Sequence, residues 1–184
     1  MLGWIILAIV IAVVVIWFVG AYNGFVAMRN RIEEAFATMD VYLKKRYDLI
    51  PNLVETVKGY AAHEQGTLEK VVAARNLAAS ATSVEDKLKG ETQLQTTLKG
   101  LFAVAEAYPD LKANSNFMDL QHQLQRLEDE IANARKYYNA VVKEFNTKTE
   151  MFPSNLIAGI FHFTRKPMFE VEDAAQRDAV NVKF

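Results

Sequence analysis

The chain has 184 residues, of which 51% are hydrophobic and 23% are charged, and this composition predicts one compact folded domain rather than a disordered chain. Its 21 lysine and arginine residues nearly balance its 22 aspartate and glutamate residues, so a net charge of −1 gives no basic field for phosphates, and we expect no nucleic-acid partner. The absence of cysteine excludes disulfides, thiol nucleophiles, iron–sulfur clusters and cysteine-type zinc sites.

The first predicted element is a transmembrane helix over residues 1–22. Residues 2–20 carry no polar side chain, and about 20 helical residues span a hydrocarbon core of roughly 30 Å. Aromatic residues typical of membrane interfaces lie near its two ends: Trp4, Trp17 and Tyr22. A cleaved signal peptide is the alternative, since residues 19–21 loosely resemble a cleavage site, but the cationic start and the short apolar segment of a signal peptide are both missing. We therefore expect a retained, single-pass anchor.

The cations beside this helix predict its orientation. None precedes it except the terminal amine, whereas Arg29 and Arg31 follow it. Because cytoplasmic flanks of membrane helices carry the excess of lysine and arginine, we expect the residues after the anchor to lie in the cytoplasm. We call this part of the chain the body.

Four helical segments are predicted after the anchor. Residues 22–60 continue the anchor helix with an apolar residue at nearly every third or fourth position: Phe25, Met28, Ile32, Ala35, Met39 and Tyr42. Pro51 either kinks this helix or lies in the first turn of a new helix capped by Asp48. Residues 67–79 form a shorter helix, and residues 84–107 form another between a Ser83/Asp86 capping box and Pro109.

The clearest helix covers residues 116–150. Its apolar positions alternate by three and four: Phe117, Leu120, Leu124, Leu127, Ile131, Ala134, Tyr138, Val141 and Phe145. Asn116 with Asp119 can cap its start, and Pro153 prevents its continuation. With no alternating strand pattern present, the sequence predicts an all-α fold in which residues 23–150 form an up-and-down four-helix bundle with a long first helix.

The tail, residues 151–184, contains a short amphipathic helix. Ser154 is a candidate cap, and Leu156, Ile157, Ile160 and Phe161 would share one face, surrounded by Phe152, Phe163 and Phe169. So large an apolar surface is expected to be covered. It can dock on its own bundle, on a neighbouring subunit, or in the bilayer interface with Arg165 and Lys166 at headgroup level. We favour docking on protein, with self-association next, and take Phe152, Pro153, Leu156, Phe161, Phe163 and Phe169 as candidate partner-binding residues.

Other polar groups fit structural roles better than catalysis. His63-Glu64 lacks the second histidine of a zinc helix, and the carboxylates at 33–34 and 128–130 are typical of a solvated helix face. The cations at 44–46 favour ion pairing within the bundle or between subunits over lipid binding. Asp48, Pro51 and Asn52 are either a partner-binding hinge or a structural kink. We expect no catalytic, metal or cofactor residue.

Three stretches carry a family resemblance. RNRIEEAF at 29–36, DVYLKKRYDLIPNLVETVKGYAAHE at 40–64 and FPSNLIAGIFHFTRKPMFE at 152–170 resemble the LemA family, and with the anchor the similarity covers nearly the whole chain. The resemblance implies a bacterial single-pass membrane protein with a four-helix-bundle body and no established enzymatic activity. Two positions depart from the family pattern, in which a tryptophan is usual at Phe36 and a glycine at His162.

These features predict a membrane-anchored helical scaffold or adaptor in the bacterial inner membrane that acts by homo-oligomerisation or by binding other membrane proteins. A regulatory subunit of a membrane protease or transporter is a special case of this function. The alternative from another class is an enzyme or small-molecule receptor with a pocket inside the bundle.

Overall fold

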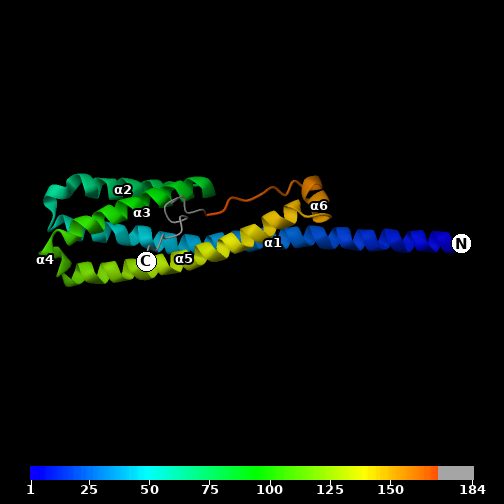
Figure 1. The fold of residues 1–184 in the computed structure, drawn as a ribbon, viewed down its shortest axis with the longest axis horizontal. Coiled ribbons are helices and arrows are strands. Elements are labelled where there is room, and N and C mark those ends of the chain that lie inside the picture. Colours follow the sequence, from blue (N-terminus) through cyan, green and yellow to red (C-terminus); the bar gives the residue numbers. More distant parts are fainter. Residues whose placement is uncertain (170–184) are drawn as a thin grey trace, which may run out of the picture. The chain divides into compact units, whose positions relative to one another are not determined.

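The computed structural model describes residues 1–169, and within this range the chain forms helices and no strand, which confirms the all-α class (Figure 1). The elements follow one another as α1 (Leu2–Lys58), η1 (Ala62–Glu64), α2 (Gln65–Ser80), α3 (Val84–Glu106), α4 (Pro109–Lys112), α5 (Ser115–Glu150) and α6 (Ser154–Ile160). The four long segments and the short tail helix were predicted to within a few residues, whereas the single turns η1 and α4 were not.

Helix α1 continues without a break from its first apolar residues, 2–20, to Lys58, with Pro51 inside it. We call residues 2–20 the apolar run. The alternative of a new helix capped by Asp48 is therefore wrong. Asp48 is itself helical, and its carboxylate lies 3.0 Å from Lys44 Nζ, one turn earlier. A side chain engaged within its own helix does not cap a second one.

Two predicted caps are also wrong, and one is confirmed. Ser83 caps α3 as expected, since its hydroxyl accepts a hydrogen bond of 3.0 Å from the amide of Asp86. Helix α5 begins before Asn116, and Asn114 takes the capping role by accepting from the amide of Phe117. Asp119 lies two residues beyond Phe117, the position whose amide this cap uses, and has no part in it.

Ser154 does not cap α6 either. Its hydroxyl donates toward the carbonyl oxygens of Lys148 and Met151, at 2.7 and 2.8 Å, and so ties α6 back to the end of α5. The N-cap position of α6 belongs to Pro153, which has no side-chain hydrogen bond to offer.

The described chain forms two compact units. The first comprises residues 1–41 and 132–168 and has a core from one face each of α1 and α5: Phe25, Ile32, Ala35, Met39, Tyr138, Val141, Val142 and Phe145. The predicted apolar seams of both segments supply all of these residues except Val142. The predicted division at residues 22 and 150, which separates anchor, bundle and tail, stays a prediction.

The second unit comprises residues 42–131 together with Phe169. Its core draws on α1, α2, α3, α4 and α5, and includes Leu43, Ile50, Leu53, Val57, Val71, Ala74, Leu94, Leu101, Leu111, Phe117, Leu124 and Ile131. Helices α2 and α3 approach closely where Gly90 meets Ala78, because a Cβ atom at Gly90 would lie only 2.7 Å from Ala78 Cα. A glycine in the middle of α3 thus permits helix packing at backbone distance.

Candidate functional site

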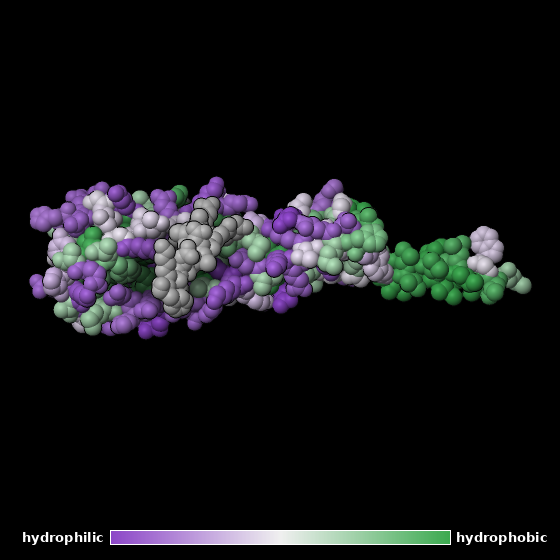
Figure 2. Space-filling view, viewed as in Figure 1, coloured by the Kyte–Doolittle hydropathy of each residue, from purple (hydrophilic) through white to green (hydrophobic). Residues whose placement is uncertain are grey.

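The side chains of residues 2–17, most of the apolar run of α1, are all exposed. The most apolar 18-residue window of the helix is entirely unburied, and by length and composition the helix can cross a membrane. Figure 2 shows this run as a continuous hydrophobic surface. The residues predicted to lie at the membrane interfaces are also exposed: Trp4 to 77%, Trp17 to 40% and Tyr22 to 36%. A core helix of a soluble protein would bury one face instead.

An aromatic cluster lies where the apolar run ends, formed by Phe18, Tyr22, Phe25, Phe145, Phe161 and Phe163. The ring of Phe161 lies 4.6 Å from that of Tyr22 and 5.8 Å from that of Phe18, measured between centroids. The ring of Phe163 stacks on Phe25 at 4.9 Å. These aromatic contacts fix the tail against the end of the apolar run.

Hydrogen bonds from two side chains of α5 to the backbone hold the segment after α6 in place. The Asn146 side chain accepts from the Lys166 amide at 2.8 Å and donates to its carbonyl at 2.9 Å, and the Tyr138 hydroxyl donates to the carbonyl of Pro167 at 3.0 Å. Part of the tail thus docks on helices of its own chain, one of the three coverings that its apolar sequence predicted. Asn146 gave no sequence signal, because an asparagine on a long helix is usually solvated.

The candidate tail residues divide between covered and exposed positions. Phe163 is half-buried and Phe169 is 7% exposed. The other four are exposed, namely Phe152, Pro153, Leu156 and Phe161. In α6 itself the buried residues are Ile157 and Ala158, so the predicted single apolar face is split into two. His162, where the family resemblance implies a glycine, has a φ of 56° in the left-handed region.

Asp48, Pro51 and Asn52 are all exposed on α1. Pro51 has no amide hydrogen, so it cannot donate to the carbonyl of Tyr47 four residues earlier. Arg75 of α2 donates to this carbonyl instead, with a distance of 3.0 Å between Nε and oxygen. The stretch therefore has a structural role in joining α1 to α2, and no spacing in the sequence pointed to Arg75.

A buried charge cluster joins three helices of the second unit. Arg46 of α1 is fully buried, and its guanidinium hydrogen-bonds to the carboxylates of Glu91 on α3 and Glu128 on α5. The hydroxyl of Tyr47 also donates to Glu91. Burial alone would lower the pKa of Arg46, but its two carboxylate partners outweigh burial and raise that pKa, so the group stays charged.

The expected ion pairing of the cations at 44–46 is confirmed for Arg46, and Lys44 pairs with Asp48 at the surface. The sequence also held a signal for the burial of Arg46. It falls three residues after Leu43 and four before Ile50, both of which are buried, so it lies on the apolar seam of α1. The view of residues 128–130 as a solvated face is wrong for Glu128, which pairs with Arg46 at 2.7 Å.

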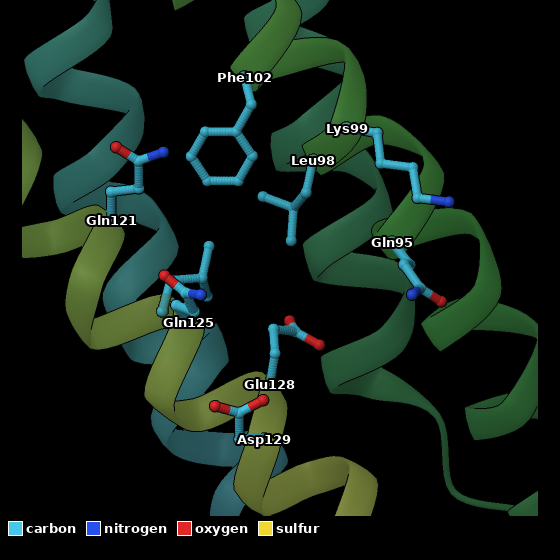
Figure 3. Close-up of a pocket in the computed structure, with 9 residues that line it drawn as sticks. Gln95, Leu98, Lys99, Phe102, Gln121, Gln125, Glu128 and Asp129 are labelled. Carbon is cyan, nitrogen blue, oxygen red and sulfur yellow. The ribbon is translucent and has the colours of Figure 1, made fainter. Parts of the chain in front are cut away.

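Glu128 also lines an open pocket between α3 and α5, with a volume of about 460 Å³. Figure 3 shows Leu98 and Phe102 facing into it, with Glu128 and Asp129 gathered along one side. Its lining residues are Gln95, Leu98, Lys99, Phe102, Gln121, Leu124, Gln125, Glu128 and Asp129. An apolar floor with amide and carboxylate groups at the rim suits a small amphiphilic molecule.

His63, His122 and His162 are all exposed. Among residues 1–169, histidine, aspartate and glutamate side chains do not gather in any group of three or more that could hold a metal ion.

Comparison with known proteins gives one family and several relatives. The model of the LemA family matches residues 35–184. The chain is 25% identical to protein LemA of Metamycoplasma hominis over 165 residues, which cover 88% of this chain and 74% of the relative. It is 26% identical to magnetosome protein MamQ 2 of Paramagnetospirillum magneticum and 24% identical to magnetosome protein MamQ of Magnetospirillum gryphiswaldense, with 83% of this chain and 66% of each relative covered.

Proposed function

The chain belongs to the LemA family, and from this premise we propose that it is a membrane-anchored helical scaffold or adaptor without catalytic activity. In this proposal α1 crosses the bacterial inner membrane once, and the body, an up-and-down four-helix bundle, lies in the cytoplasm. The body acts by homo-oligomerisation or by binding other membrane proteins. A regulatory subunit of a membrane protease or transporter would be one form of such an adaptor.

One observation carries the proposal. The apolar run has no buried residue in its central window, yet it continues within the same helix into the folded body as far as Lys58. A helix that leaves the bilayer and continues into the protein keeps the segments packed on its first part, from α5 and the tail, close to the membrane surface. A protein held in this way is suited to organising partners that lie in the same membrane.

Two experiments on the full-length protein test this function. The first is chemical crosslinking in native membranes, followed by mild-detergent extraction and quantification of recovered species. A ladder of self-multimers, or one membrane protein in stoichiometric amount, supports the scaffold or adaptor role. A monomer without any retained partner contradicts it.

The second experiment tests the anchor and its orientation. The chain contains no cysteine, so single cysteines can be introduced as unique labels. Lys44→Cys is exposed on α1 beyond the apolar run. We expect the protein to stay in the membrane pellet after alkaline carbonate extraction, and this cysteine to react with a membrane-impermeant maleimide only after cells are opened. Labelling in intact cells would reverse the orientation, and extraction by carbonate would contradict the anchor.

The pocket between α3 and α5 favours a second candidate, a receptor for a small amphiphilic molecule. Gln95→Trp would place a large ring at the mouth of the pocket without changing the core, and Gln93→Trp, also exposed on α3 but outside the pocket lining, is a matched control. A cellular phenotype lost with the first variant and kept with the second supports a bound ligand. Equal phenotypes contradict this candidate.

A further inference from the structure

The tail docks only one of its two apolar faces on protein. Ile157 and Ala158 are buried, whereas Phe152, Leu156 and Ile160 are 78%, 54% and 61% exposed. Leu156 and Ile160 are spaced by four and so project from one side of α6, and Phe152 is exposed in the turn that precedes the helix. Phe161, 41% exposed, adjoins them. We call Phe152, Leu156, Ile160 and Phe161 the outer face.

The aromatic contacts set the position of the outer face along α1. Phe161 packs against Phe18 and Tyr22, so the end of α6 lies beside residues 18–22. The apolar run ends in the same stretch, at residue 20. If residues 2–20 fill the hydrocarbon core, which is about 30 Å thick, then α6 lies at the boundary between acyl chains and headgroups. In Figure 2 the hydrophobic surface of the run adjoins a hydrophobic patch on the neighbouring part of the same unit.

We propose that the outer face inserts into the interfacial layer of the bilayer that α1 crosses, so that the protein holds the membrane at two places, a spanning helix and an interfacial one. The inference rests on the proposed function, because it needs α1 in the membrane. Phenylalanine, leucine and isoleucine are the side chains that bury at this depth in amphipathic interfacial helices.

Charge further limits what the outer face binds. Arg165 and Lys166 follow α6 and are exposed, which places two cations near the headgroups. Arg165, however, is paired with Glu150, so the local excess of positive charge is small. Insertion is therefore driven by apolar burial, and we expect it in vesicles of zwitterionic phosphatidylcholine without anionic lipid.

A second copy of the chain fits the outer face less well. Stable protein interfaces bury about 800 Å² on each partner, more than a helix of two turns and its flanking residues can supply. The bilayer needs no such minimum, because it surrounds α1 and meets every apolar side chain at that level.

Single-cysteine fluorescence quenching tests the depth of the outer face. Full-length Leu156→Cys and Ile160→Cys, labelled with bimane, are reconstituted into phosphatidylcholine vesicles with lipids that carry a nitroxide at a shallow or a deep acyl position. Val10→Cys reports the middle of the apolar run, and Asn133→Cys, exposed on α5, reports the aqueous side. All four positions are exposed, so the labels leave the core intact.

We expect the shallow nitroxide to quench positions 156 and 160 at least twofold more than position 133, and more than the deep nitroxide does. Position 10 should show the opposite depth preference. If position 10 is quenched but positions 156 and 160 behave like position 133, the anchor stands and the interfacial inference fails. If position 10 is not quenched either, the anchor fails. Crosslinking between copies through position 156 without lipid quenching assigns the outer face to a second copy and overturns the inference.

Discussion

Arg46 heads the fully buried side chains of the described residues by volume, although it is charged. Its guanidinium satisfies carboxylates from two other helices, so α1, α3 and α5 meet around one cation. Replacing a whole buried ion pair by apolar groups is often neutral, but removing one partner leaves an uncompensated charge. The cluster therefore specifies which helices pack together more than it adds to the total free energy of folding.

We predict that Arg46→Met lowers the free energy of unfolding by about 3–5 kcal/mol, because Glu91 loses its cationic partner in a buried place. Arg46→Met combined with Glu91→Met should recover a large part of this loss, since no buried carboxylate then remains at position 91. The measurement is urea unfolding of the full-length protein in mild detergent.

Lys44→Met is the matched control for Arg46→Met. Its ammonium pairs with Asp48 at the surface, where both side chains are more than half exposed. The change should stay within about 0.5 kcal/mol. A loss of less than about 1 kcal/mol for Arg46→Met would contradict the structural role of the cluster.

At the scale of an element, α1 is a long helix with a proline inside it. A proline in a helix interior removes one hydrogen bond and costs about 3 kcal/mol. Here Arg75 of α2 donates a hydrogen bond to the carbonyl of Tyr47. The hydrogen bond that the proline removes from α1 is thus replaced by one between α1 and α2. The interpretation of Pro51 as a structural feature is supported by this contact, whereas a partner-binding hinge at Asp48 and Asn52 stays a prediction.

We predict that Pro51→Ala stabilises the protein by about 1–3 kcal/mol, because alanine restores the amide donor at an exposed position. Arg75→Met should cost about 1–2 kcal/mol in the wild-type background. In the Pro51→Ala background it should cost at most half as much, since the carbonyl of Tyr47 then has a donor within α1. A double-mutant cycle of unfolding free energies measures the coupling. Equal costs in the two backgrounds would show that Arg75 does not compensate for the proline.

At the scale of the whole molecule, the apolar run differs from the rest of the described chain in the burial of its apolar side chains. The run has unburied apolar side chains throughout its central window, whereas the core residues of both compact units lie in sequence after it. The first ring contact with the tail is made by Phe18. The body therefore should fold without the first residues of the run.

We predict that deletion of residues 2–16 leaves the thermal midpoint of the body within about 3 °C of the full-length value, since a loss of 1 kcal/mol would already shift a domain of this size by about 2–4 °C. Circular dichroism of both proteins in the same detergent measures this midpoint. The deleted protein should also leave the membrane pellet in carbonate. A drop of more than about 6 °C would mean that the run packs on the body.

The long helices of this protein follow from its sequence, because apolar spacing acts over three to four neighbouring positions. The sequence also identified the apolar run, because an uninterrupted apolar stretch of about 20 residues is long enough, as a helix, to cross a bilayer. The apolar seams on α1 and α5 could be predicted because each is a periodic pattern of neighbouring positions within one helix.

The roles of the buried polar residues, in contrast, follow only from the three-dimensional packing of the helices. The partners of Arg46 lie 45 and 82 positions away, the donor for the Tyr47 carbonyl lies 28 positions away, and Asn146 holds the backbone 20 positions later. Each of these separations along the sequence is far longer than the three to four residues over which neighbours on one helix meet. No local sequence pattern could therefore reveal these pairs. Packing also divided the tail into a docked face and an outer face, because burial depends on which neighbours the fold supplies and not on the hydrophobicity of a side chain alone.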